Sequence, residues 1–431
     1  MEKVKKFVNS VHTRIAGNRK VIVAVVFYTN MIDNLLITCV VPIIPQVLVT
    51  QDQQTFENHL LLQNSSMNLS LDVFKSARLN RSTISSTRRF LQLTFNTVDT
   101  ENSKIGWILA SKALVQILAN PVAGYLANAF GNSIVSLCGT VILGLSSLIY
   151  SISADVPGLL VARATQGLGS AGVTVAGFSL LAEIYQEDIE RSRVMGVAMG
   201  GAALGVVIGY PYGGFLYAYV GPNAPFIIIG VLVLIDIVCI VLILKPVPSE
   251  KRTYHGTSIS VMLRDPYIFV ASCTLMLTTM SMSTLEATVP IWILDTMKAE
   301  KWELALVFIP DSIGYLLGTN FFGTITLRIG RWCCTLVCML VIGASLLSIP
   351  FATRVPHLIV PHFGLGLGLG ITDATIMPLL ALLVDTRHTA VYGSVYAIAQ
   401  LAVCLAYGLG PAVAGQIVKA FGFSSFMWGL S

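Results

Sequence analysis

The stretch APFIIIGVLVLIDIVCIVLILK, at residues 224–245, decides the fold of this chain. It is as long as the roughly 20 apolar residues that a helix needs to cross a bilayer. Polar residues follow at once, and Pro246 and Pro248 cannot continue a helix. The chain is therefore expected to span a membrane here and to leave it at the polar linker 246–265.

Runs of the same kind recur along the whole chain, so we predict an all-α polytopic membrane protein with eleven spans. They lie near 21–49, 105–128, 133–153, 157–184, 194–219, 224–245, 266–294, 302–327, 332–352, 356–384 and 391–420. Only 11% of the residues are charged and 55% are hydrophobic, whereas a soluble domain carries roughly 25% charged residues. The net charge of +5 is mild and indicates no nucleic-acid partner, and the eight cysteines, all in or beside apolar runs, predict no disulfide framework.

Lys and Arg in short loops mark the cytoplasmic side of a membrane protein. They precede the first span and recur in alternate loops, so the N-terminus (1–20) and the linker (246–265) are predicted to be cytoplasmic. The polar loop 50–104 then lies on the luminal side. Single sequons are common by chance, but three in one loop predict glycosylation in the secretory pathway: Asn64, Asn68 and Asn80.

The linker divides the chain into two halves, 21–245 with six spans and 266–431 with five. A twelfth span would be expected to begin near Ser431, so the second half is predicted to be truncated. Two homologous halves around a central cytoplasmic loop are typical of a major-facilitator transporter.

Glycine spacing supports this repeat. Gly124 and Gly131 bracket the turn after the second span, and Gly323 and Gly330 bracket the turn after the eighth. The alternative is that short turns favour glycine in any protein.

Seven ionisable residues fall inside predicted spans: Asp33, Lys112, Arg163, Asp236, Glu286, Asp311 and Asp373. Each costs on the order of 2.5–3.5 kcal/mol near mid-bilayer, so a paired or functional role is expected for those deep inside their runs. Among the seven, Arg163 and Asp236 are the charges best explained as accidental ones near a helix end, without a functional role.

Polar and aromatic residues recur on helix faces near these charges. Lys112 and Gln116 lie four residues apart, which places them on one face. Two further faces combine rings with polar groups: Phe308, Ser312 and Tyr315, and Tyr396, Gln400 and Tyr407. A buried tyrosine hydroxyl needs a polar partner, so these faces predict a wet cavity inside the bundle, with ordinary packing as the alternative for Phe308.

Such a cavity suits a small aromatic or aliphatic ammonium ion. Carboxylates attract the charge, and ring faces add about 0.5–2 kcal/mol of cation–π attraction. A desolvated carboxyl group takes up a proton more readily, so Asp33, Glu286 and Asp373 can exchange a proton for a cationic substrate. Antiport would then draw on about 1.4 kcal/mol per proton per pH unit.

Other patterns indicate packing. Gly201, Gly205, Gly209 and Gly213 recur every fourth residue and predict a smooth ridge for close helix contact. The alternating glycines at 364–370 lie inside a span with no preceding strand, which argues against a dinucleotide loop. No His/Cys metal spacing and no nucleophile elbow occurs, so no metal, no cofactor and no enzymatic activity are expected.

Eight segments carry a resemblance to a known family: DNLLITCVVPIIP (33–45), ASKALVQ (110–116), ARATQGLGS (162–170), RDPYI (264–268), LEATVPIW (285–292), FIPDSIGYLLGTNFFG (308–323), GRW (330–332) and LVDTRHTAVYGSVYAIA (383–399). In them the chain resembles the vesicular amine transporters of the major facilitator superfamily, and the monoamine branch most closely. The resemblance covers nearly all spans, and its last segment is highly specific.

The resemblance implies that Asp33 and Glu286 engage the amine. It places Asn34, Lys112 and Arg163 in the same pocket, which would also bind reserpine- or tetrabenazine-type inhibitors. Further aromatic pocket or gate positions would be Trp292, Phe308, Tyr315 and Tyr407. Proton coupling would depend on Asp33, Lys112, Glu286, Asp373 and position Gln400.

A cytoplasmic gate is also implied by the resemblance. Arg191 would pair with Asp385, and Met195 and Tyr392 would lie beside this pair. The partners implied are a small amine, protons and the lipid bilayer, and the protein is expected to be a monomer.

Departures from the family pattern bear on transport. The family pairs the second-span lysine with an aspartate of the eleventh span, where this chain has Gln400. Lys112 is then expected either to pair with Asp33 or to give up its proton more easily, and weaker proton coupling is expected. Asp311 replaces a small neutral residue, Tyr210 replaces a proline, and two luminal cysteines of the family are missing.

The leading hypothesis is a proton-coupled antiporter that loads cationic monoamines (serotonin, dopamine, noradrenaline, histamine) from the cytoplasm into acidic secretory or synaptic vesicles. Alternatives are a polyspecific organic-cation/proton exporter and a vesicular acetylcholine carrier. A different class, a transport-deficient amine-binding homologue, follows from Gln400 and the missing twelfth span.

Overall fold

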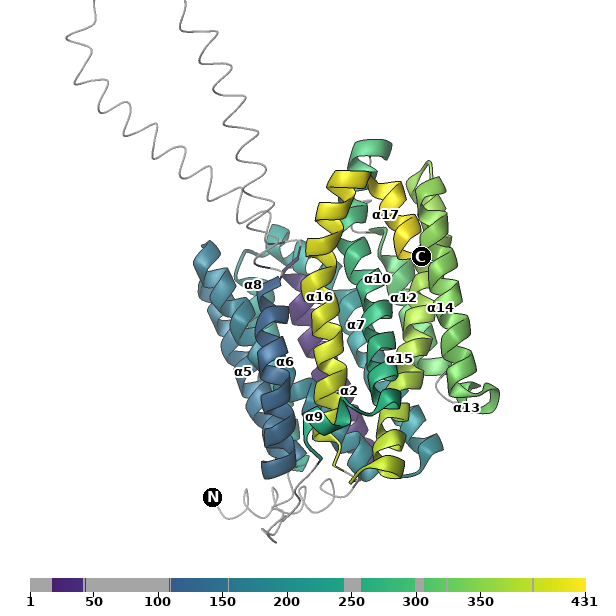
Figure 1. Ribbon diagram of the computed structural model, residues 1–431. Helices are drawn as coiled ribbons and strands as arrows, with labels where there is room; N and C mark the ends of the chain where they lie inside the picture. Colours follow the sequence, from purple (N-terminus) through teal and green to yellow (C-terminus); the bar gives the residue numbers. More distant parts are fainter. Residues whose placement is uncertain are drawn as a thin grey trace, which may run out of the picture.

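A computed structural model describes residues 18–41, 43, 108, 110–153, 155–243, 257–298, 306–322, 325–389 and 391–431. In these ranges the chain folds into a bundle of long helices that run side by side (Figure 1). Ten described helices are long and apolar enough to cross a membrane. The three sequons, Gly323 and most of the linker lie outside the described residues.

The helices of the first half are α2 (Arg19–Cys39), the helix Ala110–Phe130, α5 (Asn132–Ile152), α6 (Val156–Ile184), α7 (Asp188–Tyr219) and α8 (Ala224–Ile243). Those of the second half are α10 (Pro266–Met297), α12 (Ile309–Phe321), α14 (Arg331–Ser348), α15 (Ile359–Arg387) and α16 (Gly393–Phe421). Shorter pieces are α9 (Ile259–Met262), α13 (Ile325–Ile329), η1 (Ile349–Phe351), η2 (Val355–Leu358) and α17 (Phe423–Leu430). The all-α prediction is confirmed, and α12, with 13 residues, stands where the eighth span was predicted.

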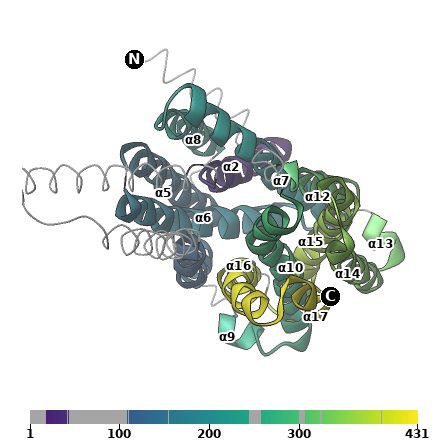
Figure 2. The ribbon, with the colours of Figure 1, turned by 90° about the horizontal axis from the view of Figure 1, so that it is seen from above.

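The two halves repeat the same helix pairs. In the first half α2 packs along α7 and α5 along α6, and in the second α10 packs along α16 and α14 along α15. Figure 2 shows the helices of each half grouped on their own side, with α7 next to α12. The turns before α5 and α14 also match, because Gly131 and Gly330 have φ values of 100° and 101°, a left-handed conformation that favours glycine. This agreement supports the repeat predicted from the glycine spacing.

Glycines set the closest helix contacts, as predicted. On α7, a Cβ at Gly205 would meet the carbonyl oxygen of Met31, and a Cβ at Gly213 would meet that of Cys39, both on α2. On α15, Gly366 lies directly against the backbone of Asp311 in α12. Gly366 and Gly370 of α15 therefore pack against α12, which positions two side chains of the candidate site, whereas Gly364 and Gly368 pack against α14.

The outward faces of the helices are apolar, and the polar side chains are inside. On α8 the exposed residues include Ile227, Val231, Leu234 and Val238, whereas Asp236 on the same helix is buried. A water-soluble bundle would show the reverse pattern, so lipid is the expected solvent of the outer surface.

Candidate functional site

The first half contributes a buried polar group around Asp33 on α2. Ser170 of α6 donates a hydrogen bond to the Asp33 carboxylate. Nearby on α6, Arg163 is only 2% exposed and donates to Gln166 Oε1 at 3.4 Å, which also accepts from the Tyr150 hydroxyl at 3.2 Å. The structure thus corrects the interpretation of Arg163 as a charge near a helix end, since this guanidinium is buried among polar partners.

Lys112 takes its polar partner from its own helix. Its Nζ donates to Gln116 Oε1 at 3.0 Å, as their spacing of four residues predicts. Asp33 does not form an ion pair within 4.0 Å with Lys112 in the described structure, although both lie close enough to Cys404 of α16 to interact with it electrostatically. Gln400, one helical turn from Cys404, is buried and carries no charge. Lys112 therefore has a neutral amide as its nearest acceptor.

The second half contributes three acids and two tyrosines. Glu286 comes from α10, Asp311 from α12 and Asp373 from α15. The Tyr315 hydroxyl of α12 donates to Asp373 Oδ2 at 2.9 Å. Tyr407 of α16 interacts electrostatically with all three carboxyl groups. Glu286, Asp311 and Asp373 are here termed the acidic cluster.

Tyr210 of α7 joins this acidic cluster from the first half. It interacts with Glu286 and Asp311, and also with Arg163. Tyr210 therefore lies within electrostatic range of Arg163 in the first half and of two acids in the second. The first half thus contributes Asp33, Lys112 and Arg163, and the second half contributes Glu286, Tyr315, Asp373 and Tyr407.

Phe308 and Asn34, predicted for the pocket, and Trp292, predicted for a gate, make the following contacts. Phe308 packs edge-on against His362, with ring centroids 5.7 Å apart, which supports the packing alternative for this residue. Trp292 stacks on Phe423 of α17 at 4.4 Å. Asn34 donates to the carbonyl of Asn30 at 3.0 Å, one turn back on its own helix.

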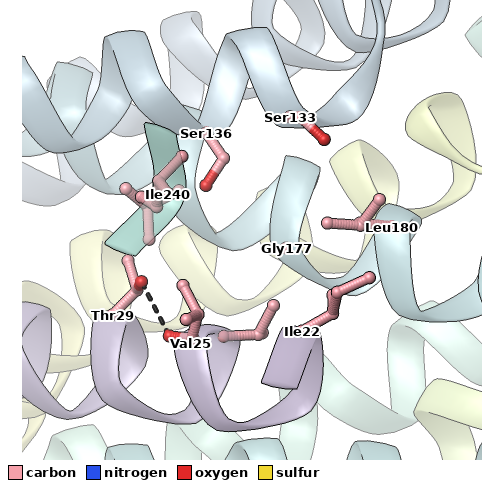
Figure 3. Close-up of a pocket in the computed structure, with 10 residues that line it drawn as sticks. Ile22, Val25, Thr29, Ser133, Ser136, Gly177, Leu180 and Ile240 are labelled. Carbon is pink, nitrogen blue, oxygen red and sulfur yellow. Dashed lines mark hydrogen bonds between the residues drawn. The ribbon is translucent and has the colours of Figure 1, made fainter. Parts of the chain in front are cut away.

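Asp236 also departs from the sequence-based interpretation. It is 1% exposed, and the Thr29 hydroxyl of α2 lies 3.0 Å from its Oδ1. Thr29 also lines a small cavity between α2, α5, α6 and α8, together with Ser136 and Ile240 (Figure 3). The cavity holds about 20 Å³, enough for about one water molecule and too little for an amine. Asp236 is thus a buried polar contact inside the first half, separate from the acidic cluster.

The two halves are joined at the end of the bundle that contains α9, here termed the α9 end. Arg191, 1% exposed, donates to Asp385 Oδ2 at 2.7 Å and to the carbonyls of Tyr185 and Gln186. The Tyr392 hydroxyl donates to the other oxygen of Asp385 at 2.6 Å, and its ring lies 5.6 Å from the Arg191 guanidinium carbon. Arg191, Asp385 and Tyr392, predicted as one gate, therefore lie together.

Further contacts close the same end. Met195 is fully buried, and the Tyr396 hydroxyl lies 3.4 Å from its sulfur. Arg331 of α14 donates to Asp188 of α7 at 2.6 Å, and Asn128 Nδ2 donates to the Ser394 hydroxyl at 3.0 Å. These bonds connect opposite halves, so closure here rests on several separate contacts.

The opposite end, where α17 lies, differs. Within the described ranges, the hydrogen bonds between the halves run from Asn120–Cys404 towards the α9 end. Tyr407, on the α17 side of Cys404, is 37% exposed. Among the described residues, the hydrogen bonds that join the halves therefore lie between mid-bundle and the α9 end.

Asp265 forms a separate charged group at the start of α10. It accepts from Arg387 Nε at 2.6 Å, from the Tyr267 backbone N–H at 3.0 Å, and lies 3.2 Å from His388 Nε2. Burial alone would raise the pKa of Asp265, but these hydrogen bonds and the charge of Arg387 outweigh burial and lower the pKa below its ordinary value of 3.8. The carboxylate caps α10 and ties it to the end of α15.

Replacing Asp265 with asparagine is expected to lower the thermal unfolding temperature at pH 7 by a few degrees. Because the folded-state pKa lies below the unfolded-state value, the carboxylate stabilises the fold above pH 3.8, and this contribution is lost as the pH falls through the lowered pKa. Thermal unfolding of the parent protein and the variant in detergent, at pH 7 and at pH 3, measures the difference in unfolding temperature at each pH. The difference between the two proteins should shrink at pH 3, and an equal difference at both pH values would contradict this account.

Several of these residues were not found from the sequence alone. Arg331 and Asp188 stand at helix ends, where charged residues are common and need no partner. Tyr210 was noted only as a replaced proline. A usable signal did exist for Asp188, since it lies three residues before Arg191 and so shares its helix face at the start of α7.

Comparisons with known proteins agree with this architecture. The Major Facilitator Superfamily pattern matches residues 26–411. The synaptic vesicular amine transporter of Homo sapiens is 38% identical over 436 residues, covering 95% of this chain and 85% of that protein. The human chromaffin granule amine transporter is also 38% identical, with the same coverage. The vesicular acetylcholine transporter of Torpedo marmorata is 32% identical and covers 100% of this chain and 84% of its own length.

A solved structure shares the fold. The human organic anion transporter MFSD10 (TETRAN) superposes with a TM-score of 0.74 at 16% identity, covering 96% of this chain and 97% of its own. The bundle of repeated halves and the superfamily match define a membrane transporter and not an enzyme. Within that class, the chain belongs to the vesicular amine transporter family of the major facilitator superfamily.

Proposed function

We propose that the protein is a proton-coupled antiporter that carries cationic monoamines, of the serotonin, dopamine, noradrenaline and histamine class, from the cytoplasm into acidic vesicles. The observation that carries this proposal is the acidic cluster of Glu286, Asp311 and Asp373 beside Tyr315 and Tyr407. Carboxylates and tyrosine rings together recognise an ammonium group attached to an aromatic body. The names of the relatives, vesicular amine transporters, support the same substrate class and location.

Alternating access assigns a role to each end of the bundle. The α9 end follows the linker that the basic residues predict to be cytoplasmic, so its closure corresponds to a form open towards the lumen. Arg191, Asp385, Tyr392 and Met195 would then act as the cytoplasmic gate. Trp292, stacked on Phe423 near the α17 end, would belong to the luminal gate.

The test is uptake by the purified full chain in proteoliposomes with an acidic interior. Radiolabelled serotonin should accumulate, a protonophore should abolish the accumulation, and reserpine and tetrabenazine should inhibit it. Accumulation of acetylcholine but not serotonin would instead favour the acetylcholine carrier, and uptake of many unrelated cations the polyspecific exporter. Serotonin binding without any uptake would favour the transport-deficient homologue.

The transport-deficient alternative has a specific structural basis. Lys112 donates to the neutral amide of Gln116, and the buried residue at position 400 is a glutamine. A lysine without a nearby carboxylate gains less from carrying a proton inside the bundle. Proton coupling is therefore proposed to be weak in this chain.

Replacing Gln400 with aspartate should increase uptake driven by a pH gradient, by about threefold or more, because it adds a carboxyl group one turn from Cys404, which already interacts with Lys112. Serotonin uptake at several imposed pH gradients measures the change. The control is Gln400→Asn, which changes the size but adds no charge. Unchanged dependence on the gradient in Gln400→Asp would refute the proposed role of position 400.

A further inference from the structure

Asp311 is buried at the start of α12 with an unused acceptor. It is 4% exposed, and its Oδ1 has no hydrogen-bond partner among the residues that the structure describes. Its backbone is held by direct contact with Gly366 of α15, so the side chain cannot move away by a simple shift of the helix. A buried carboxylate oxygen without a partner is costly, which indicates that a ligand group completes its contacts.

The surroundings of Asp311 indicate that this ligand group carries a positive charge. Asp311 interacts electrostatically with Glu286, and Tyr315 interacts with both Asp311 and Asp373. Among the described residues, no basic side chain pairs with these acids within 4.0 Å, and Arg163 of the first half interacts with Tyr210. Three carboxyl groups thus share one region that has no cationic side chain of its own among the residues described.

Asp311 needs a nearby cation to carry a negative charge, because burial opposes ionisation and the helix dipole offsets only part of that cost. It is the acidic residue in the first turn of α12, where backbone N–H groups and the helix dipole stabilise a negative charge. One ammonium group on a ligand can neutralise one carboxylate closely, and it leaves a second acid of the cluster without a counter-charge. A ligand with two ammonium groups can neutralise both.

We propose that Asp311 forms a second ammonium subsite beside Glu286, so that the protein prefers dicationic amines, with ammonium groups at both ends, over monocationic amines of the same length. This inference rests on the proposed amine-carrier function and names the substrate class more narrowly. Glu286 and Tyr407 bind one ammonium group, and Asp311 binds the other. Tyr315 keeps Asp373 hydrogen-bonded beside them.

The experiment compares butylamine with 1,4-diaminobutane, which differ only in the second ammonium group. The purified full chain in lipid nanodiscs is titrated with each compound at constant ionic strength, and binding is measured from the rise in unfolding temperature. The diamine is expected to bind at least about tenfold more tightly than the monoamine, the size of one charged hydrogen bond. Equal affinities would overturn the proposal.

Three variants test whether Asp311 causes the preference for the diamine. Asp311→Asn and Asp311→Ser should each lower the affinity ratio to about one, and the second variant guards against a folding defect specific to the first. Asp295→Asn is the matched control, because Asp295 is an exposed acid at the end of α10 and its replacement should leave the ratio as it is. A ratio that persists in both Asp311 variants would show that the second subsite lies elsewhere and overturn the assignment.

Serotonin binding is measured on the same samples, so that the two proposals can fail separately. Failure to bind serotonin or either amine would reject the amine-carrier function. Serotonin binding with no preference for the diamine would reject only the second subsite.

Discussion

Replacing Arg191 with methionine should open the α9 end of the protein. The guanidinium makes hydrogen bonds to Asp385 and to two backbone carbonyls, and methionine can make none of them. Asp385 would remain without its counter-charge, although it still accepts from Tyr392 and is partly exposed. Allowing for that exposure, we expect a loss of about 1–3 kcal/mol of closure energy, or a shift of roughly 5- to 150-fold towards the open form.

Disulfide cross-linking across the halves measures this closure. Asn128 and Ser394 lie in hydrogen-bond contact across the halves, so Asn128→Cys with Ser394→Cys should form a disulfide while the α9 end is closed. In a background without the native cysteines, Arg191→Met should slow cross-linking at least about fivefold. Arg193→Met, an exposed arginine two residues away, is the control. The charge-swapped pair Arg191→Asp with Asp385→Arg should restore part of the rate, and an unchanged rate in Arg191→Met would contradict the gate assignment.

Replacing Glu286 with glutamine should cause the largest loss of amine affinity. Glu286 interacts with Asp311 and Tyr407 of the second half and with Tyr210 of the first, so its charge acts on both halves of the bundle. Removing the charged partner of a desolvated ammonium group costs about 2–5 kcal/mol, and we therefore expect serotonin to bind roughly a hundredfold more weakly. The glutamine keeps the shape of the side chain, so the loss reports the charge.

Equilibrium binding of radiolabelled serotonin to protein in nanodiscs tests this expectation. Glu190→Gln, at an exposed position near the start of α7, carries the same chemical change away from the cluster and should bind serotonin as tightly as the parent protein. If Glu286→Gln bound serotonin with parental affinity, the carboxylates could not be the ammonium-binding groups, and the proposed function would lose its main support.

The fold followed closely from the sequence because a membrane makes strong demands on it. Each span must satisfy its backbone hydrogen bonds within a helix and present apolar side chains to lipid, so long apolar runs reveal the helices. The turn at Gly131 recurs at Gly330. α12 was less predictable: the described helix is 13 residues long and begins only after Phe308. A hydropathy pattern does not show where a helix starts inside an apolar segment.

The location of the candidate site was predictable for its acids, since Asp33, Glu286 and Asp373 are costly in lipid and had to face inward. Asp236 was harder, because whether a single charge within an apolar helix is buried depends on which neighbour covers it, here Thr29 of α2. The pairing of Arg331 with Asp188 depends on how two distant segments meet, and no local pattern contains that information.

The two ion pairs at the start of α7 are balanced in charge across the interface between the halves. The first half contributes Asp188 and Arg191 to the interface, and the second half contributes Arg331 and Asp385, so each side carries one positive and one negative charge. Separating the halves therefore moves no net charge, and the membrane voltage, worth about 2.3 kcal/mol per charge per 100 mV, does little work on this step. Any voltage dependence of the transport cycle would have to arise from the cargo and the protons that cross.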